Sequence, residues 1–187
     1  MKILRANERF ETQQPGIHTW HCFSTGSHYD PDNLSFGPLI GVDEHLVDPG
    51  AGFAEHLHRD VEIISWVAEG QLSHTSGDET QVINADESVI QDGVTIRHTE
   101  RNDGEEPLRL IQTMLLADSG ATFTVAKAAT EVQAPWVHLF VVDGSWQWDD
   151  DSLEAGDSVR STDNKMHNLD GAGVVLMLSH PGLALPA

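Results

Sequence analysis

Short apolar runs separated by turn residues extend along most of the chain. Val, Ile and Leu are concentrated at residues 61–68, 81–83, 88–90, 108–116, 137–142 and 174–178. Gly, Asp, Ser and Asn lie between these runs, as expected of turns that join strands. No window of helix length keeps a helical period, and only residues 125–131 allow one short helical turn. The pattern predicts an all-β protein, built as a sandwich or as barrels.

An internal echo divides the chain into two parts. Residues 66–74 read WVAEGQLSH, and residues 140–148 read FVVDGSWQW. Each has an apolar strand, an acidic residue, a glycine and a second strand, and a turn with an acidic residue follows at residues 84–88 and 154–158. We therefore predict two tandem antiparallel β-barrels, with domains at residues 1–119 and 120–187.

The net charge of the chain limits the kinds of partner that it can bind. Lys and Arg total 10, Asp and Glu total 30, and the formal net charge is −20. Nucleic acid phosphates and anionic membrane surfaces repel such a polyanion, so neither is expected as a partner. Cys22 is the only cysteine, and the start of the chain lacks the apolar stretch of a secretory signal. We expect a cytoplasmic protein without a membrane span.

Two pairs of polar residues indicate a metal site. His56 and His58 lie two residues apart, as do His98 and Glu100. Residues two apart in a strand point to the same face, so two neighbouring strands would bring three imidazoles and one carboxylate together. Such ligands suit iron, nickel, copper, manganese or zinc, and four of them leave two positions of an octahedral ion open for substrate and dioxygen.

The other histidines and the tryptophans have simpler interpretations. In the first quarter of the chain, surface or hydrogen-bonding roles are expected for His18, His21, His28 and His45. A structural role is expected for His74. The second half has no His-x-His motif, so its barrel is predicted to be metal-free. Packing in the core or between the barrels is predicted for Trp136, Trp146 and Trp148. A stacking surface for an aromatic ligand is the alternative for the last two.

The histidine motifs resemble those of the cupin superfamily and, more closely, those of the pirin family. Pirins carry His-Pro-His-Arg-Gly-Phe-Glu-Thr, then Glu-Gly, then Gly-x-x-x-x-His-Ser-Glu. This chain reads His-Leu-His-Arg-Asp-Val-Glu-Ile at residues 56–63, Glu-Gly at 69–70 and Gly-Val-Thr-Ile-Arg-His-Thr-Glu at 93–100. Leu57, Asp60 and Val61 depart from the pirin text. The resemblance is close over residues 53–102 and holds only in outline elsewhere.

The resemblance implies a bicupin of the double-stranded β-helix type. The chain is short for the family, so the C-terminal barrel is expected to be abbreviated. The implied metal ligands are His56, His58, His98 and Glu100. Fe(II) is the first expectation for the ion, with Ni, Cu, Mn or Zn as alternatives.

Two carboxylates compete to be the fourth ligand. General cupins use the glutamate that stands here as Glu62, and pirin-like proteins use the one that stands here as Glu100. The spacing from Gly93 to His98 follows the pirin form and favours Glu100. Glu62 would then orient a ligand imidazole, as metal sites commonly require.

Three functions are compatible with this site. The resemblance implies a quercetinase, a dioxygenase that cleaves the ring of flavonols such as quercetin. Glu100 or Glu62 would be its general base, and Phe53, Ile96 and Trp66 could form the walls of its cavity. The alternative is a non-catalytic, iron-binding, redox-sensitive regulator that binds a protein partner. A weaker third is an isomerase that uses the metal as a Lewis acid.

Overall fold

The computed structural model describes residues 1–182, and nearly all of their regular structure is β-strand. Every strand pairing is antiparallel, so the predicted all-β class is confirmed. The chain forms two compact units. One is Phe10–Ser119, and the other combines Met1–Arg9 with the chain from Gly120 onward. No helix among the described residues is long and apolar enough to cross a membrane.

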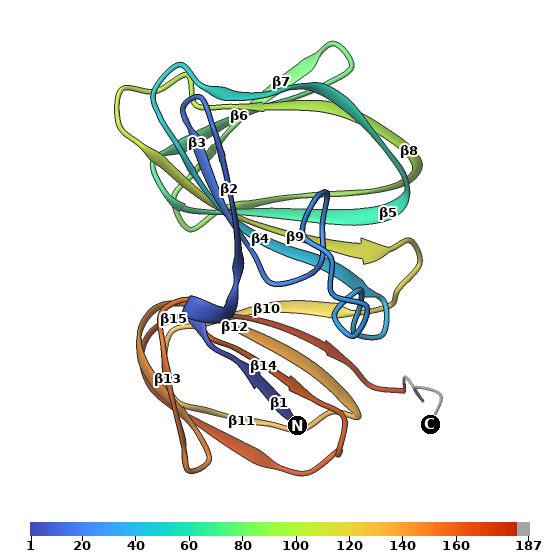
Figure 1. Ribbon diagram of the computed structural model, residues 1–187, viewed down its shortest axis with the longest axis vertical. Coiled ribbons are helices and arrows are strands. Elements are labelled where there is room, and N and C mark those ends of the chain that lie inside the picture. The colour runs from blue at the N-terminus through green and yellow to red at the C-terminus, as the bar shows by residue number, and fades with distance from the viewer. Residues whose placement is uncertain (183–187) are drawn as a thin grey trace. The chain divides into compact units, whose positions relative to one another are not determined.

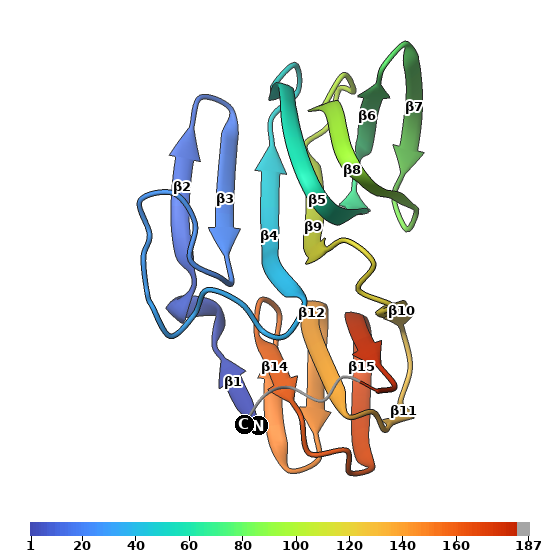
Figure 2. The same cartoon turned by 90° about the vertical axis from the view of Figure 1, so that its right-hand side faces the viewer.

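The unit Phe10–Ser119 contains one eight-stranded sheet in the order β2-β3-β4-β9-β5-β8-β6-β7. Its strands are β2 (Phe10–Gln14), β3 (Ile17–His21), β4 (Leu39–Val47), β5 (Gly52–Glu69), β6 (Gln71–Ser76), β7 (Glu79–Asn84), β8 (Ser88–Arg101) and β9 (Leu108–Leu116). Figure 1 shows the long strands β5 and β8 running side by side through a common curve. Figure 2 shows β2, β3 and β4 as neighbours.

One end of this sheet carries a closely packed apolar cluster on its inner face. Its buried members are Ile17, Val47, Val67, Leu72, Ile83, Leu108 and Leu110. Ile17 of β3 lies opposite Val47 of β4, which lies opposite Leu108 of β9, so the cluster follows the strand register. Apolar burial of this kind supplies the main stabilisation of a domain and positions the polar residues further along the same strands.

In strand β5, the set of residues that face inward switches from even-numbered to odd-numbered at Asp60. This residue has a positive φ of 54° and lies between His58 and Val61. His58 is paired with Ile96, and Val61 and Ile63 pack in one buried cluster with the same Ile96. Even-numbered residues therefore face inward before Asp60, and odd-numbered residues face inward after it. This switch reverses the simple two-residue alternation of a strand.

The second unit contains one seven-stranded sheet. Its strands are β1 (Lys2–Leu4), β10 (Thr122–Ala126), β11 (Thr130–Val132), β12 (Trp136–Trp148), β13 (Asp151–Glu154), β14 (Ser158–Ser161) and β15 (His167–His180), with a short 3-10 turn η1 (Ala6–Glu8). The first nine residues group with this unit because β1 pairs with β14, in contrast to the domain 1–119 expected from the sequence. The helical turn considered for residues 125–131 is wrong, because Val125 pairs with Leu176 and Ala126 with Val175.

The two units share one local construction. Gly70 and Gly144 have positive φ values of 78° and 81°, and each follows a shift in strand register. A Cβ atom on Gly70 would lie 2.5 Å from the carbonyl oxygen of Pro107, and one on Gly144 would lie 1.9 Å from that of Ala172. Only glycine fits such close approaches of two backbones.

The turns that follow the two glycines are also alike. The amide of Val67 donates to the carbonyl of Glu87, and the carbonyl of Val67 accepts from Asp86. Val141 makes the same two bonds, with Asp157 and Gly156. The echo in the sequence therefore corresponds to one repeated backbone arrangement.

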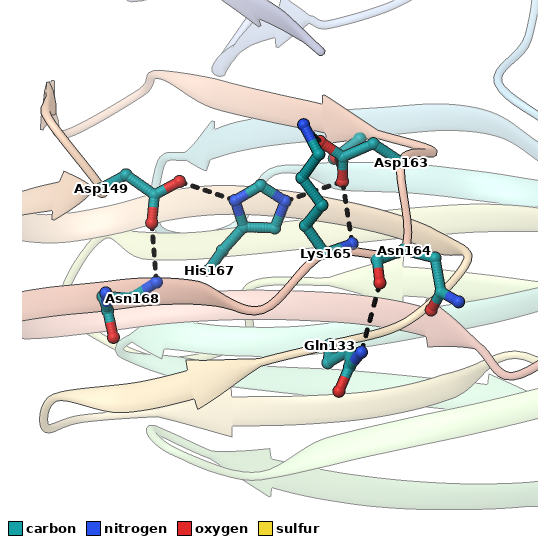
Figure 3. A network of polar contacts seen from close by, with 8 residues as sticks. Gln133, Asp149, Asp163, Asn164, Lys165, His167 and Asn168 are labelled. Carbon is teal, nitrogen blue, oxygen red and sulfur yellow. Dashed lines mark hydrogen bonds and ion pairs between the residues drawn. The ribbon is translucent and has the colours of Figure 1, made fainter.

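A buried histidine joins two turns of the second unit (Figure 3). Nδ1 of His167 lies 2.7 Å from Oδ2 of Asp149, and its Nε2 lies 2.8 Å from Oδ1 of Asp163. Carboxylates only accept hydrogen bonds, so both bonds require a doubly protonated ring. The ring also stacks on Trp148, 4.6 Å between centroids.

Protonation of this ring is favoured despite its burial. Burial opposes the charge, but the hydrogen bonds to Asp149 and Asp163 outweigh it and raise the pKa of His167. The hydrogen bond from His167 lowers the pKa of Asp149 and lowers that of Asp163 to about 2.

We call His167 with its two carboxylate partners, Asp149 and Asp163, the clamp. We predict that this clamp makes the free energy of unfolding depend on pH. The contribution of His167 is complete below its unfolded pKa and is lost as pH rises through the higher folded value. The contribution of the aspartates is present above their unfolded pKa and is lost as pH falls toward about 2. The clamp is therefore strongest between about pH 4 and about pH 6.5. Thermal unfolding followed by circular dichroism should show His167→Gln losing most stability in this window. An equal loss at alkaline pH would contradict the clamp.

Candidate metal centre

Three imidazoles meet where β5 pairs with β8. His56 lies directly opposite His98 in the register, and His58 lies two residues further along β5. The ring centroids of His56 lie 4.7 Å from His58 and 4.4 Å from His98. One nitrogen of each ring lies within 4.8 Å of the others. The three histidines named from the sequence therefore form one cluster.

The hydrogen bonds of His56 leave one nitrogen lone pair of its ring directed at His98. Nδ1 of His56 donates to the carbonyl of Ala54 at 2.9 Å, so its Nε2 carries a lone pair in the neutral ring. The Nε2 atoms of His56 and His98 are 3.0 Å apart. Two ligands about 2.1 Å from one ion and about 90° apart are separated by about 3 Å, so this spacing fits a shared metal.

His58 supplies a nitrogen without a partner. Its Nε2 is buried and has no hydrogen bond among the described residues. Burial lowers the pKa of His58, and burial also lowers the pKa of His98 to about 4, against the opposing charge of Glu100. Both rings are therefore neutral near pH 7, which is the form that binds a metal.

Glu100 lies beside the cluster on the inner face of β8. Its side chain is 2% exposed. Ser65 Oγ donates to Oε1 at 2.8 Å, and Gln112 Nε2 lies 2.9 Å from both carboxylate oxygens. A carboxylate held by several donors keeps a fixed orientation. Glu100 also groups with His74 and His98 as potential ligands within 4.8 Å.

His74 is placed to orient His98. Its Nε2 lies 3.1 Å from Nδ1 of His98 and 2.8 Å from Oε1 of Gln91. The sequence suggested only a structural role for this residue. A hydrogen bond to the far nitrogen of an imidazole fixes the ring plane and the tautomer.

Glu62 is directed away from the cluster. The switch at Asp60 turns Ser65 inward to Glu100, so Glu62 lies on the opposite face. Its carboxylate accepts a hydrogen bond from Ser119 Oγ at 3.2 Å. Glu62 is thus absent from both groups of potential metal ligands among the described residues.

The cluster opens into a cavity of about 210 Å³. The residues that line it are Thr12, Gln14, Thr19, His21, Asp43, His45, Phe53, His56, His58, Glu100, Gln112 and Met114. His56 and His58 are half-buried residues, whereas the Nε2 atom of His58 is itself buried. Phe53 forms part of the wall as the sequence suggested, whereas Ile96 and Trp66 are absent from the lining.

The sequence assigned ordinary roles to two residues of the cavity wall. His21 and His45 were expected to be surface or hydrogen-bonding residues. Both do make hydrogen bonds, but they are 8% and 5% exposed and line the cavity. Thr19 and His21 lie two residues apart on one strand, as do Asp43 and His45 on the next, so each pair shares a face. That spacing is a signal of a polar inner face, although it fits a polar surface equally well.

The second unit offers no comparable cluster among the described residues. His138 is fully buried, and burial together with the charge of Arg160 lowers its pKa well below the ordinary value. His167 has both nitrogens engaged by carboxylates. The three tryptophans of this unit are buried, in agreement with their predicted packing role.

Residues 4–115 match the sequence profile of the family described as Pirin. The chain belongs to the pirin family. A quercetin 2,3-dioxygenase of Escherichia coli K12 is 32% identical over 119 residues, which make up 62% of this chain and 52% of that protein. A pirin-like protein of Caulobacter vibrioides is 36% identical over 101 residues, or 51% of this chain and 44% of that protein. This pirin spans about half the length of these curated relatives.

The fold is also that of a solved pirin. The crystal structure of bacterial pirin YhhW from Escherichia coli in complex with nickel(II) superposes with a TM-score of 0.86. The match covers 97% of this chain and 99% of that chain at 22% identity. At this identity the likeness concerns the fold alone.

We predict that the carboxylate of Glu100 depends on Gln112. Gln112→Leu removes the donor to both oxygens and should lower the free energy of unfolding by about 2 kcal/mol, since a buried charged group loses its partner. Urea denaturation of chelator-treated protein measures the change. Gln81→Leu, at an exposed position of β7, is the control and should have little effect. Equal effects of the two substitutions would contradict a stabilising role for the hydrogen bonds from Gln112 to Glu100.

Proposed function

We propose that this pirin binds one divalent transition metal ion and uses it with dioxygen to cleave the ring of a flavonol such as quercetin. The ligands in this proposal are His56, His58 and His98, with Glu100 as the fourth. The observation that carries it is the convergence of three imidazoles beside a cavity, one of them with a buried nitrogen that has no hydrogen bond among the described residues. The names of its relatives agree with this activity.

The ion itself is proposed from its ligand chemistry. Three imidazoles and a carboxylate suit first-row metals, and Fe(II) is our first expectation. The nickel(II) in the solved E. coli pirin supports nickel as an alternative, and Cu, Mn or Zn would accept the same ligands. Such an ion acts as a Lewis acid and makes a bound hydroxyl group more acidic.

The residues of the cavity have distinct roles in this proposal. Glu100 is the general base, which accepts the proton of the flavonol hydroxyl that lies nearest the ligands. Ser65 and Gln112 hold its carboxylate in place. The ring of Phe53 would pack against the flat substrate, since aromatic rings favour stacked or edge contacts. The cavity is smaller than typical ligand pockets, so a three-ring substrate would extend toward solvent, and we expect modest turnover.

A regulator that binds a protein partner is the second candidate. The net charge of −20 would attract a basic protein, and a redox-active iron could change the adjacent surface. Bound iron that cycles between oxidation states without consuming quercetin would favour this role.

We predict that each ligand substitution removes the metal without unfolding the chain. His56→Ala, His58→Ala and His98→Ala should each abolish stoichiometric binding, while circular dichroism stays unchanged because the apolar clusters supply the stability. Elemental analysis after purification without chelators measures occupancy. Glu100→Gln should weaken binding, and Glu62→Gln is the matched control. A stronger effect of Glu62→Gln would favour the general cupin arrangement.

We predict measurable quercetin consumption that requires both metal and dioxygen. Oxygen uptake and quercetin absorbance should change together in the metal-loaded protein. Both should fail in His98→Ala and in anaerobic buffer. If the metal-loaded protein leaves quercetin at its spontaneous oxidation rate, the dioxygenase proposal is wrong and the binding role takes its place.

A further inference from the structure

A row of polar residues crosses the inner face of the unit Phe10–Ser119. His21 lies opposite Asp43, Asp43 opposite Gln112, and Gln112 opposite Ser65, across strands β3, β4, β9 and β5. At one end of this row, Ser65 and Gln112 donate hydrogen bonds to the carboxylate of Glu100. Buried polar side chains cost free energy unless they are paired, and an inner face readily accepts apolar residues instead. The polar residues His21 and Asp43 at the far end of the row are therefore candidates for a functional role.

At that far end, three side chains form a hydrogen-bonded chain. Oδ1 of Asp43 lies 2.8 Å from Nδ1 of His21, and Nε2 of His21 lies 2.9 Å from Oγ1 of Thr12. The carboxylate only accepts, so Nδ1 of His21 carries a proton, and Nε2 can accept from the threonine hydroxyl when it carries none. All three residues line the cavity that also contains His56 and His58. A hydroxyl, an imidazole and a carboxylate in this order can take up a proton.

The same wall of the cavity contains a buried polar atom, Nε2 of His45, that has no hydrogen bond among the described residues. His45 is 5% exposed and lines the cavity, and its Nδ1 lies 2.8 Å from Thr19 Oγ1. Burial lowers the pKa of His45, so the ring is neutral and offers either a donor or an acceptor to a ligand. This second feature indicates that the wall binds a polar group.

We propose that Thr12, His21 and Asp43 form a proton relay that binds and deprotonates a second, acidic hydroxyl group of a phenolic substrate. The substrate O–H bond breaks, and its proton goes to Oγ1 of Thr12 while the threonine proton goes to Nε2 of His21. The products are a phenolate, an intact threonine hydroxyl and an imidazolium whose Nδ1–H remains bonded to Asp43. The relay rests on the proposed function only for the class of substrate.

The charged and titratable groups around the relay are compatible with this role. Asp43 faces His21 from β4 and stabilises the imidazolium. Nε2 of His28 lies 3.3 Å from Oγ1 of Thr12, and the centroid of the His28 ring lies 6.0 Å from that of His21. His45, on the same strand as Asp43, interacts electrostatically with His21. The relay thus takes up its proton at a point separate from Glu100 (strands β2, β3 and β4 in Figure 2).

The test uses 4-nitrophenol, which has one acidic hydroxyl group and changes absorbance when it ionises. The full chain is studied as purified and after chelator treatment, about one pH unit below the pKa of the free probe. We expect at least half of the bound probe to be phenolate in both preparations, a shift of about one unit or more in its pKa. Thr12→Ser keeps the hydroxyl and should retain this ionisation. Thr12→Val, His21→Gln and Asp43→Asn should lose it.

His18 provides the matched control. It lies on the same strand as His21 but pairs with Glu11, at 3.1 Å, on the other face of the sheet. His18→Gln should leave the ionised probe unchanged. A wild-type chain that binds no probe, or binds it neutral, overturns the relay, as does ionisation that survives His21→Gln. Because the assay needs neither dioxygen nor metal, probe ionisation without quercetin consumption would contradict only the dioxygenase. Quercetin consumption with a neutral probe would contradict only the relay.

Discussion

The antiparallel register between β5 and β8 is the constraint on which the candidate metal centre depends. It places His56 opposite His98, and from that pair the positions of His58 and Glu100 follow by strand geometry. A slip of one residue in either strand would turn its inner side chains to the opposite face. The apolar cluster at the other end of the sheet helps to hold the register, because a slip would move Val67 of β5 or Val89 of β8 away from it.

The inner face of this sheet is divided along its strands. Apolar residues fill one end, and the polar row from His21 to Ser65 lies next to them. Hydrogen bonds among the polar side chains offset their desolvation. Among the described residues, one buried nitrogen of His45 and one of His58 have no hydrogen bond, and both residues line the cavity. A ligand in the cavity could supply the missing bonds of these two nitrogens.

The second unit shows what the same construction becomes when its inner face is apolar. It repeats the glycine and turn arrangement of the first, but its buried cluster contains Trp146, Trp148 and Leu169. His167 of this unit has a carboxylate on each ring nitrogen, and we expect it to stabilise the fold (Figure 3). The inner face of the second unit is thus packed with apolar side chains, whereas part of the inner face of the first unit is polar and lines a cavity.

The sequence by itself determined the strands, the repeat and the identity of the three clustered histidines. These features are local, since a spacing of two residues fixes which side chains share a face of a strand. Only the tertiary structure decided which carboxylate lies beside the histidines, because the switch at Asp60 reverses the alternation that would otherwise put Glu62 on the same face as His58. It also decided the positions of Thr12, His21, Asp43 and His45. Polar residues that alternate along a strand look the same in sequence whether they face solvent or a cavity, and the pairing of distant strands makes the difference.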